Sequence, residues 1–119
     1  MTQNYGLTTK GEYAPDALIS GSHPVVEIPV TLVQATANTL DRGQILSVIT
    51  SSGKYTKLDT SKSDGSELPK AVLAVDADAT SSDIKAFAYV HGEFAADALI
   101  GLTSAVKAQL QAIGIYAKS

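Results

Sequence analysis

The stretch Ile84–Phe94 reads Ile-Lys-Ala-Phe-Ala-Tyr-Val-His-Gly-Glu-Phe and is the most strand-like run in the chain. Because successive side chains of a strand point to opposite faces, one face of this run is continuously apolar. The other face begins charged, becomes aromatic at Phe87 and Tyr89, and ends polar at His91 and Glu93. A strand with apolar surface on both faces is usually central in its sheet. We therefore expect the rest of the domain to pack against this strand.

Composition restricts the possible functions. The chain has 119 residues, which suits a single domain. Its apolar residues include many Ala but only two Phe and no Trp, so an oligomer could supply additional burial. The net charge is −3 and the basic residues are spread singly, which argues against direct nucleic-acid contact. The chain has no cysteine, which removes disulfides, thiolate metal ligands and a cysteine nucleophile. No apolar run has the length of a membrane span, and the polar N-terminus does not resemble a signal peptide.

Short strands are predicted after residue 24. Apolar residues alternate along 26–32, and Pro29, which lacks an N–H, places one side of that strand at an edge or a bulge. The strand-like runs 44–50 and 54–59 flank Ser-Ser-Gly and predict a hairpin. A further strand is expected at 70–76. The segments 35–43 and 60–68 are expected to be loops.

One helix is expected near the C-terminus. Thr103 can cap its start, and Gly114 suits the left-handed residue that follows a helix. The segment 95–102 before it is either irregular or a helical turn, and 115–117 is short and β-prone. The sequence thus predicts a mainly β domain with about six strands and one short C-terminal helix. The expected apolar positions of the helix are Val106, Leu110 and Ile113.

Residues 1–24 differ from the rest of the chain because polar and small residues dominate and no periodicity is sustained. We expect a flexible N-terminal arm there, followed by a single domain over 25–119. The arm is either a tail without a role or a segment that becomes ordered on a partner, for example as an added strand. Its spaced apolar side chains, which keep both alternatives open, are Tyr5, Leu7, Tyr13, Leu18 and Ile19.

Three short motifs resemble catalytic or metal-binding sequences, and each lacks an essential part. The tripeptide His-Gly-Glu at 91–93 matches half of the zinc deaminase signature, whose Pro-Cys-x-x-Cys half is absent. Asp-Ala-Asp at 76–78 begins like a calcium loop, but Ser and Phe stand where Gly and Glu are needed. Ser-Gly-Lys at 52–54 lacks the earlier glycine and the following Ser or Thr of a phosphate loop. We therefore expect no enzyme, no catalytic residue, no metal and no cofactor.

The order of seven short segments resembles the lambda-type bacteriophage head decoration proteins. Together they span residues 15–116, and their order and spacing make the resemblance specific. The segments are 15–21 (Pro-Asp-Ala-Leu-Ile-Ser-Gly), 26–32 (Val-Glu-Ile-Pro-Val-Thr-Leu), 40–46 (Leu-Asp-Arg-Gly-Gln-Ile-Leu), 52–55 (Ser-Gly-Lys-Tyr), 71–80 (Ala-Val-Leu-Ala-Val-Asp-Ala-Asp-Ala-Thr), 88–94 (Ala-Tyr-Val-His-Gly-Glu-Phe) and 112–116 (Ala-Ile-Gly-Ile-Tyr).

The resemblance implies a small, mainly β domain of the β-barrel or β-tulip type that forms a homotrimer. Such trimers sit on the outer surface of the expanded capsid head, at threefold and quasi-threefold positions, and stabilise it against the pressure of packaged DNA. Their partner is the major capsid protein, on which the arm becomes ordered. The protein is then expected in the virion after synthesis in the host cytoplasm, without direct contact to nucleic acid or membrane. The capsid-binding residues expected in the arm are Tyr13, Pro15, Leu18 and Ile19.

The arm is not expected to become ordered as a whole. The conformational entropy lost by fixing all its residues exceeds the free energy that its few apolar side chains return on burial. We therefore expect residues 13–24, nearest the domain, to become ordered and the first ten to stay loose.

Two other functions remain open from sequence alone. One is a free-standing ligand-binding β module, for example for carbohydrate, although the chain has no Trp and only scattered Tyr to stack on sugars. The other is a minor subunit of an enzyme whose active site lies elsewhere. A trimer that binds expanded heads would favour decoration, and a monomer with a ligand-filled cleft would favour the ligand-binding module.

Overall fold

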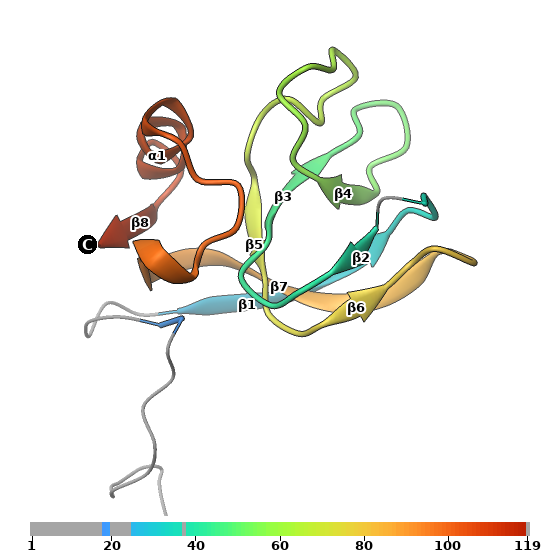
Figure 1. The fold of residues 1–119 in the computed structure, drawn as a ribbon, viewed down its shortest axis with the longest axis horizontal. Coiled ribbons are helices and arrows are strands. Elements are labelled where there is room, and N and C mark those ends of the chain that lie inside the picture. The colour runs from blue at the N-terminus through green and yellow to red at the C-terminus, as the bar shows by residue number, and fades with distance from the viewer. Residues whose placement is uncertain (1–17, 20–24, 37, 119) are drawn as a thin grey trace, which may run out of the picture.

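The computed structural model describes residues 18–19, 25–36 and 38–118 (Figure 1). The elements are β1 Val26–Leu32, β2 Thr39–Leu40, β3 Ile45–Val48, β4 Tyr55–Lys57, β5 Ala71–Leu73, β6 Ala77–Asp78, β7 Ile84–Ala95, the 3-10 turn η1 Ala96–Ala98, α1 Ser104–Gln111 and β8 Ile115–Lys118.

The main sheet closes into a small barrel. Its strand order is β1-β4-β3-β5-β7-β8, and β1 also pairs with β7, so that β1, β4, β3, β5 and β7 form a closed ring. β8 extends the sheet outside this ring, next to α1 (Figure 1). The short strands β2 and β6 pair separately with each other. The prediction of a mainly β domain with a barrel and one short helix is confirmed.

β7 is the central strand, as the alternation of its residues predicted. It has 12 residues and pairs with β1 and β5 in its first part and with β8 in its last part. Gly92 is the first residue of β7 that pairs with β8, and its φ of +143° favours glycine. A Cβ atom at this position would lie 3.2 Å from Cγ2 of Val25 and 3.3 Å from Cζ of Phe94. Glycine therefore lets the strand pass from the barrel to β8 without displacing these side chains.

Two apolar clusters lie on opposite faces of the same strands. Consecutive strand residues point to opposite faces, so Ile45 joins one cluster and Leu46 the other. The barrel core consists of Val30, Leu32, Leu40, Leu46, Ala71, Leu73, Ala79, Ala86 and Ala88. The outer core, which also takes residues from α1 and β8, consists of Leu18, Ile45, Val72, Ala74, Tyr89, Phe94, Leu99, Val106, Leu110, Ile115 and Ala117.

The C-terminal helix begins where it was predicted. The side-chain oxygen of Thr103 accepts a hydrogen bond from the backbone N–H of Val106 at 3.2 Å, which satisfies one of the free donors of the first turn. Val106 and Leu110 are buried in the outer core. Ile113 is 40% exposed, contrary to its expected place on the apolar face, because α1 ends at Gln111 and the chain turns before it.

Other expectations are confirmed or corrected by the strand pairing. β3 and β4 form the predicted hairpin. β1 pairs with β7 on one side, and on its other side it pairs with β4 only at Leu32. Pro29 therefore has an unpaired strand edge on that side, as predicted. The segment 35–43 is not entirely a loop, since it contains β2. A strand of two residues is too short to produce an alternating pattern.

Within the described residues, no helix has the length and apolarity needed to cross a membrane.

Candidate functional site

The first feature that relates to function is a two-residue attachment of the N-terminal segment to the domain. Leu18 is 2% exposed and belongs to the outer core. Its backbone oxygen accepts a hydrogen bond from the N–H of Ala95 at 2.7 Å, and Ile19 forms an antiparallel bridge with Phe94. We call Leu18 and Ile19 the anchor. They hold the chain against the last part of β7, just before η1.

The anchor contains two of the four residues that were expected to bind the capsid from a flexible arm. In the free domain Leu18 is buried and Ile19 is paired with a strand. Pairing with β7 brings Leu18 into the outer core, a long-range contact that the local polar pattern does not reveal. Tyr13 and Pro15 lie outside the described residues, as does the expected arm boundary at residue 24.

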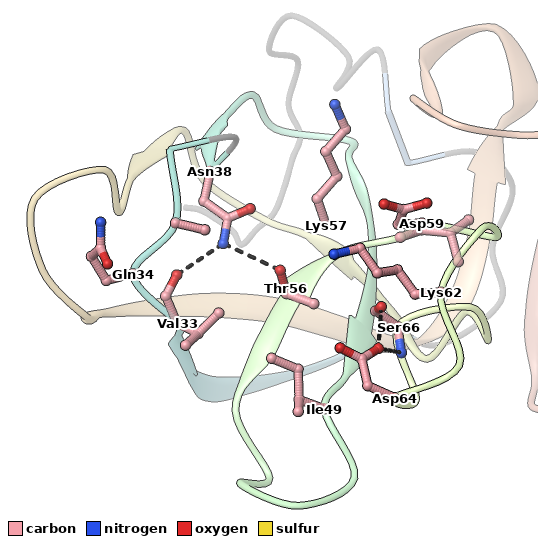
Figure 2. A pocket seen from close by; sticks show the side chains of 12 residues that line it. Val33, Gln34, Asn38, Ile49, Thr56, Lys57, Asp59, Lys62, Asp64 and Ser66 are labelled. Carbon is pink, nitrogen blue, oxygen red and sulfur yellow. Dashed lines mark hydrogen bonds between the residues drawn. The ribbon is translucent and has the colours of Figure 1, made fainter.

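The second feature is an open groove of about 540 Å³ between the chain that follows β1 and the strand β4 (Figure 2). Figure 1 shows β4 on the side of the barrel away from the anchor, which is the short blue segment. Asn38 lines the groove, and only 1% of its surface is exposed. Its Nδ2 donates hydrogen bonds to the backbone oxygen of Val33 at 2.8 Å and to Oγ1 of Thr56 at 3.2 Å. The lining residues are Val33, Gln34, Ala35, Asn38, Ile49, Thr56, Lys57, Leu58, Asp59, Lys62, Asp64 and Ser66.

Two carboxylates of the groove are held in local turns. Asp59 accepts hydrogen bonds from the hydroxyl and the N–H of Ser61, and Asp64 accepts the same pair from Ser66. These bonds favour the ionised form, so the pKa of each carboxyl lies below its usual value. With Lys57 and Lys62, the groove carries two positive and two negative side chains, which makes its formal charge neutral.

One charged contact ties together the strand ends beside the groove. Oδ2 of Asp83 lies 2.6 Å from Nζ of Lys54, and its Oδ1 accepts a hydrogen bond from the N–H of Gln34 at 2.6 Å. Asp83 precedes β7, Gln34 follows β1, and Lys54 precedes β4. The bond from Lys54 and then that from Gln34 lower the pKa of Asp83. The contact therefore stabilises this end of the barrel while Asp83 is ionised.

Acid should remove this contribution. Because the pKa of Asp83 is lower in the folded state than the ordinary value of 3.8, its stabilisation is complete above that value and is lost as the pH falls through the folded pKa. We expect Asp83→Asn to lower the melting temperature at pH 7 and to have progressively less effect below pH about 4. Thermal unfolding of both proteins across that range checks this. A constant difference between them would contradict it.

The motif at 91–93 has a structural role. The ring of His91 contacts that of Tyr116 edge-on at 6.5 Å between centroids, and Glu93 lies 3.3 Å from Nζ of Lys118. Both partners belong to β8, so this motif helps to pair β7 with β8. Across the described ranges, no group of three or more His, Cys, Asp or Glu residues is placed to hold a metal ion.

Comparison with known families decides the class of protein. The model of the bacteriophage lambda head decoration protein D family matches residues 7–115. The chain belongs to this family. The match includes the anchor, the barrel, α1 and the first residue of β8. Among curated proteins no match was found.

Family membership fixes the general role. As a member of the head decoration family, the protein decorates a phage capsid and is a structural component of the virion. The anchor lies at the last part of β7, and β4, which lines the groove, lies on another side of the barrel (Figure 1).

Proposed function

We propose that the protein forms homotrimers that bind the outer surface of the expanded head at threefold and quasi-threefold positions. The N-terminal arm attaches each subunit to the major capsid protein, and the trimer stabilises the head against the pressure of packaged DNA. The observation that supports this best is the family match over 7–115, which includes most of the arm as well as the domain.

The anchor gives the arm a mechanism. Because Leu18 is buried and bonded to Ala95, a coat contact made by Tyr13 would be connected to the folded domain only five residues further along the chain. A short connection restricts the positions that the bound arm can explore and so raises its effective concentration at the coat surface. In this proposal Tyr13 and Pro15 contact the coat protein, while Leu18 and Ile19 hold the arm to the domain.

Three arms in one trimer act together. After one arm binds, the other two find their sites at high effective concentration, so modest single contacts give stable attachment. A trimer that bridges several coat subunits also holds each of them, because loss of one subunit requires breaking its contacts to the trimer. No chemical reaction is needed for this stabilisation.

Sedimentation with purified heads tests the proposal. The protein should elute as a trimer by light scattering and should co-sediment with expanded heads until the threefold and quasi-threefold positions are filled. Decorated heads should retain packaged DNA at temperatures at which bare heads lose it. A monomer that does not bind heads would contradict the proposal.

Tyr13→Ala should weaken head binding, with Tyr5→Ala as the matched control. Burial of a Tyr side chain contributes about 1.5–3 kcal/mol, so loss of this contact should reduce the affinity of each arm about tenfold or more. Tyr5 belongs to the first ten residues, which we expect to stay loose, so its substitution should have little effect. Binding isotherms with heads measure both. Equal losses would show that the contact begins nearer the N-terminus.

A further inference from the structure

The groove exists because the pairing of β1 with β4 stops early. The two strands are parallel and register at Leu32 with Tyr55. The N–H of Val33 donates to the oxygen of Tyr55 at 2.9 Å. In a continued parallel ladder, Lys57 would next donate its N–H to the oxygen of Val33 and accept the N–H of Ala35.

Both of these bonds are diverted to other groups. The oxygen of Val33 accepts Nδ2 of Asn38 at 2.8 Å, and the N–H of Ala35 donates to the oxygen of Ala79 at 3.1 Å (Figure 2 shows the first). Asn38 thus takes the place that the backbone of Lys57 would have had. It holds β1 and β4 apart at the point where the barrel would otherwise continue to close.

The backbone of Lys57 is therefore directed into the groove. Lys57 stands opposite Leu46 of β3, but the oxygen of Leu46 accepts the N–H of Lys70 at 2.8 Å, so the polar groups of Leu46 face β5. Leu46 and Lys57 are thus a non-hydrogen-bonded pair of the antiparallel ladder. In such a pair the backbone N–H and C=O groups of the two residues point away from each other, so those of Lys57 face away from β3. Within the described part of the chain, neither its N–H nor its oxygen has a hydrogen-bond partner.

Asn38 adds a buried acceptor to this edge. Its Nδ2 makes two bonds, whereas its Oδ1 accepts none from the described residues. A polar side chain that is 1% exposed normally has its hydrogen-bonding capacity filled, and an unfilled group costs free energy. The residues that line the groove therefore include one donor and two acceptors without a partner among the described residues, which is the pattern presented by the edge of a strand.

We propose that the groove binds an extended segment of the coat protein, which adds as a short strand along β4. This inference rests on the proposed function and extends it by a second contact. A backbone segment supplies both the N–H and the carbonyl groups that Lys57 and Asn38 lack. The neutral balance of the two Lys and two Asp side chains suits a segment without net charge. Because β4 lies away from the anchor, one subunit can hold coat protein at two separate places (Figure 1).

The comparison of Lys57→Pro with Lys57→Ala tests this contact. Proline removes the N–H of residue 57, and β4 tolerates it at this position because neither β1 nor β3 accepts this donor. Alanine removes the ammonium group and keeps the N–H, so it is the matched control. We expect Lys57→Pro to bind heads at least about fivefold more weakly than Lys57→Ala, which should resemble the wild type. Thermal unfolding confirms that both variants fold.

Hydrogen exchange on the wild-type protein gives an independent readout that does not depend on the proline variant folding. The amide of Lys57 should exchange rapidly in the free protein and become protected on heads. Equal head binding by the wild type and both variants, together with unprotected Lys57, would overturn this inference and leave attachment by the arm intact. If the wild type itself did not bind heads, the proposed function would fail as well.

Two other outcomes would assign the groove to a different occupant and overturn the inference. If Lys57→Pro prevents trimer formation, the groove binds a second copy of the chain. If the amide of Lys57 is already protected in the free protein and loses that protection when residues 1–17 are removed, the groove binds the arm.

Discussion

Removal of residues 1–17 should abolish stable attachment to heads while leaving the melting temperature of the free protein nearly unchanged. The deletion removes Tyr13 and Pro15, the proposed coat contacts, and keeps Leu18 and Ile19 in place. Since the buried side chain of Leu18 and its bond to Ala95 remain, every described residue of the outer core is kept. Co-sedimentation with expanded heads and thermal unfolding of the free protein measure the two effects separately.

Removal of residues 1–19 is the matched control for this deletion. It takes two more residues and with them the anchor, so it should lower the melting temperature as well as prevent attachment. Wild-type head affinity after removal of 1–17 would exclude the arm from the mechanism. Equal melting temperatures for the two truncated proteins would show that the anchor does not stabilise the free domain.

Leu18→Ala should destabilise the free protein by about 2–5 kcal/mol, the usual cost of a leucine removed from a packed core. Leu18 is 2% exposed and packs in the same cluster as Phe94 and Leu110. Its truncation leaves a cavity that the surrounding β-strands and helix fill only in part. In a domain of this size the melting temperature should fall by roughly 10–20 °C.

Ile19→Ala is the comparison for the leucine substitution. Ile19 is only partly buried, and its bridge to Phe94 uses backbone groups that alanine retains, so the loss of stability should be clearly smaller. Chemical denaturation gives the two free energies. If Leu18→Ala unfolds like the wild type, Leu18 does not occupy the outer core in solution.

Much of the barrel could be predicted because its strands carry local patterns. The alternation along Ile84–Phe94 identified the central strand, and the two runs around Ser-Ser-Gly identified the hairpin of β3 and β4. Thr103 and Gly114 bracketed the helix because capping chemistry acts within a few residues. Each of these signals depends on neighbours in sequence.

The anchor and the groove could not be predicted because long-range contacts create them. Leu18 is buried only because the chain returns to it at Phe94 and Ala95, more than seventy residues later. Asn38 lies in the segment 35–43, which was expected to be a loop, and no local pattern indicates that its amide replaces Lys57 as the partner of Val33. The match to the decoration family began earlier in the chain than the segments that suggested it, which start at residue 15.

The position of the anchor on β7 has a mechanical consequence. A force applied to the bound arm would enter the domain through Leu18 and Ile19 and pass directly to Phe94 and Ala95. β7 shares backbone pairing with β1, β5 and β8, so the load would be divided among three neighbouring strands instead of peeling a single one from an edge. A swelling shell would thus pull on the most widely supported strand of each subunit.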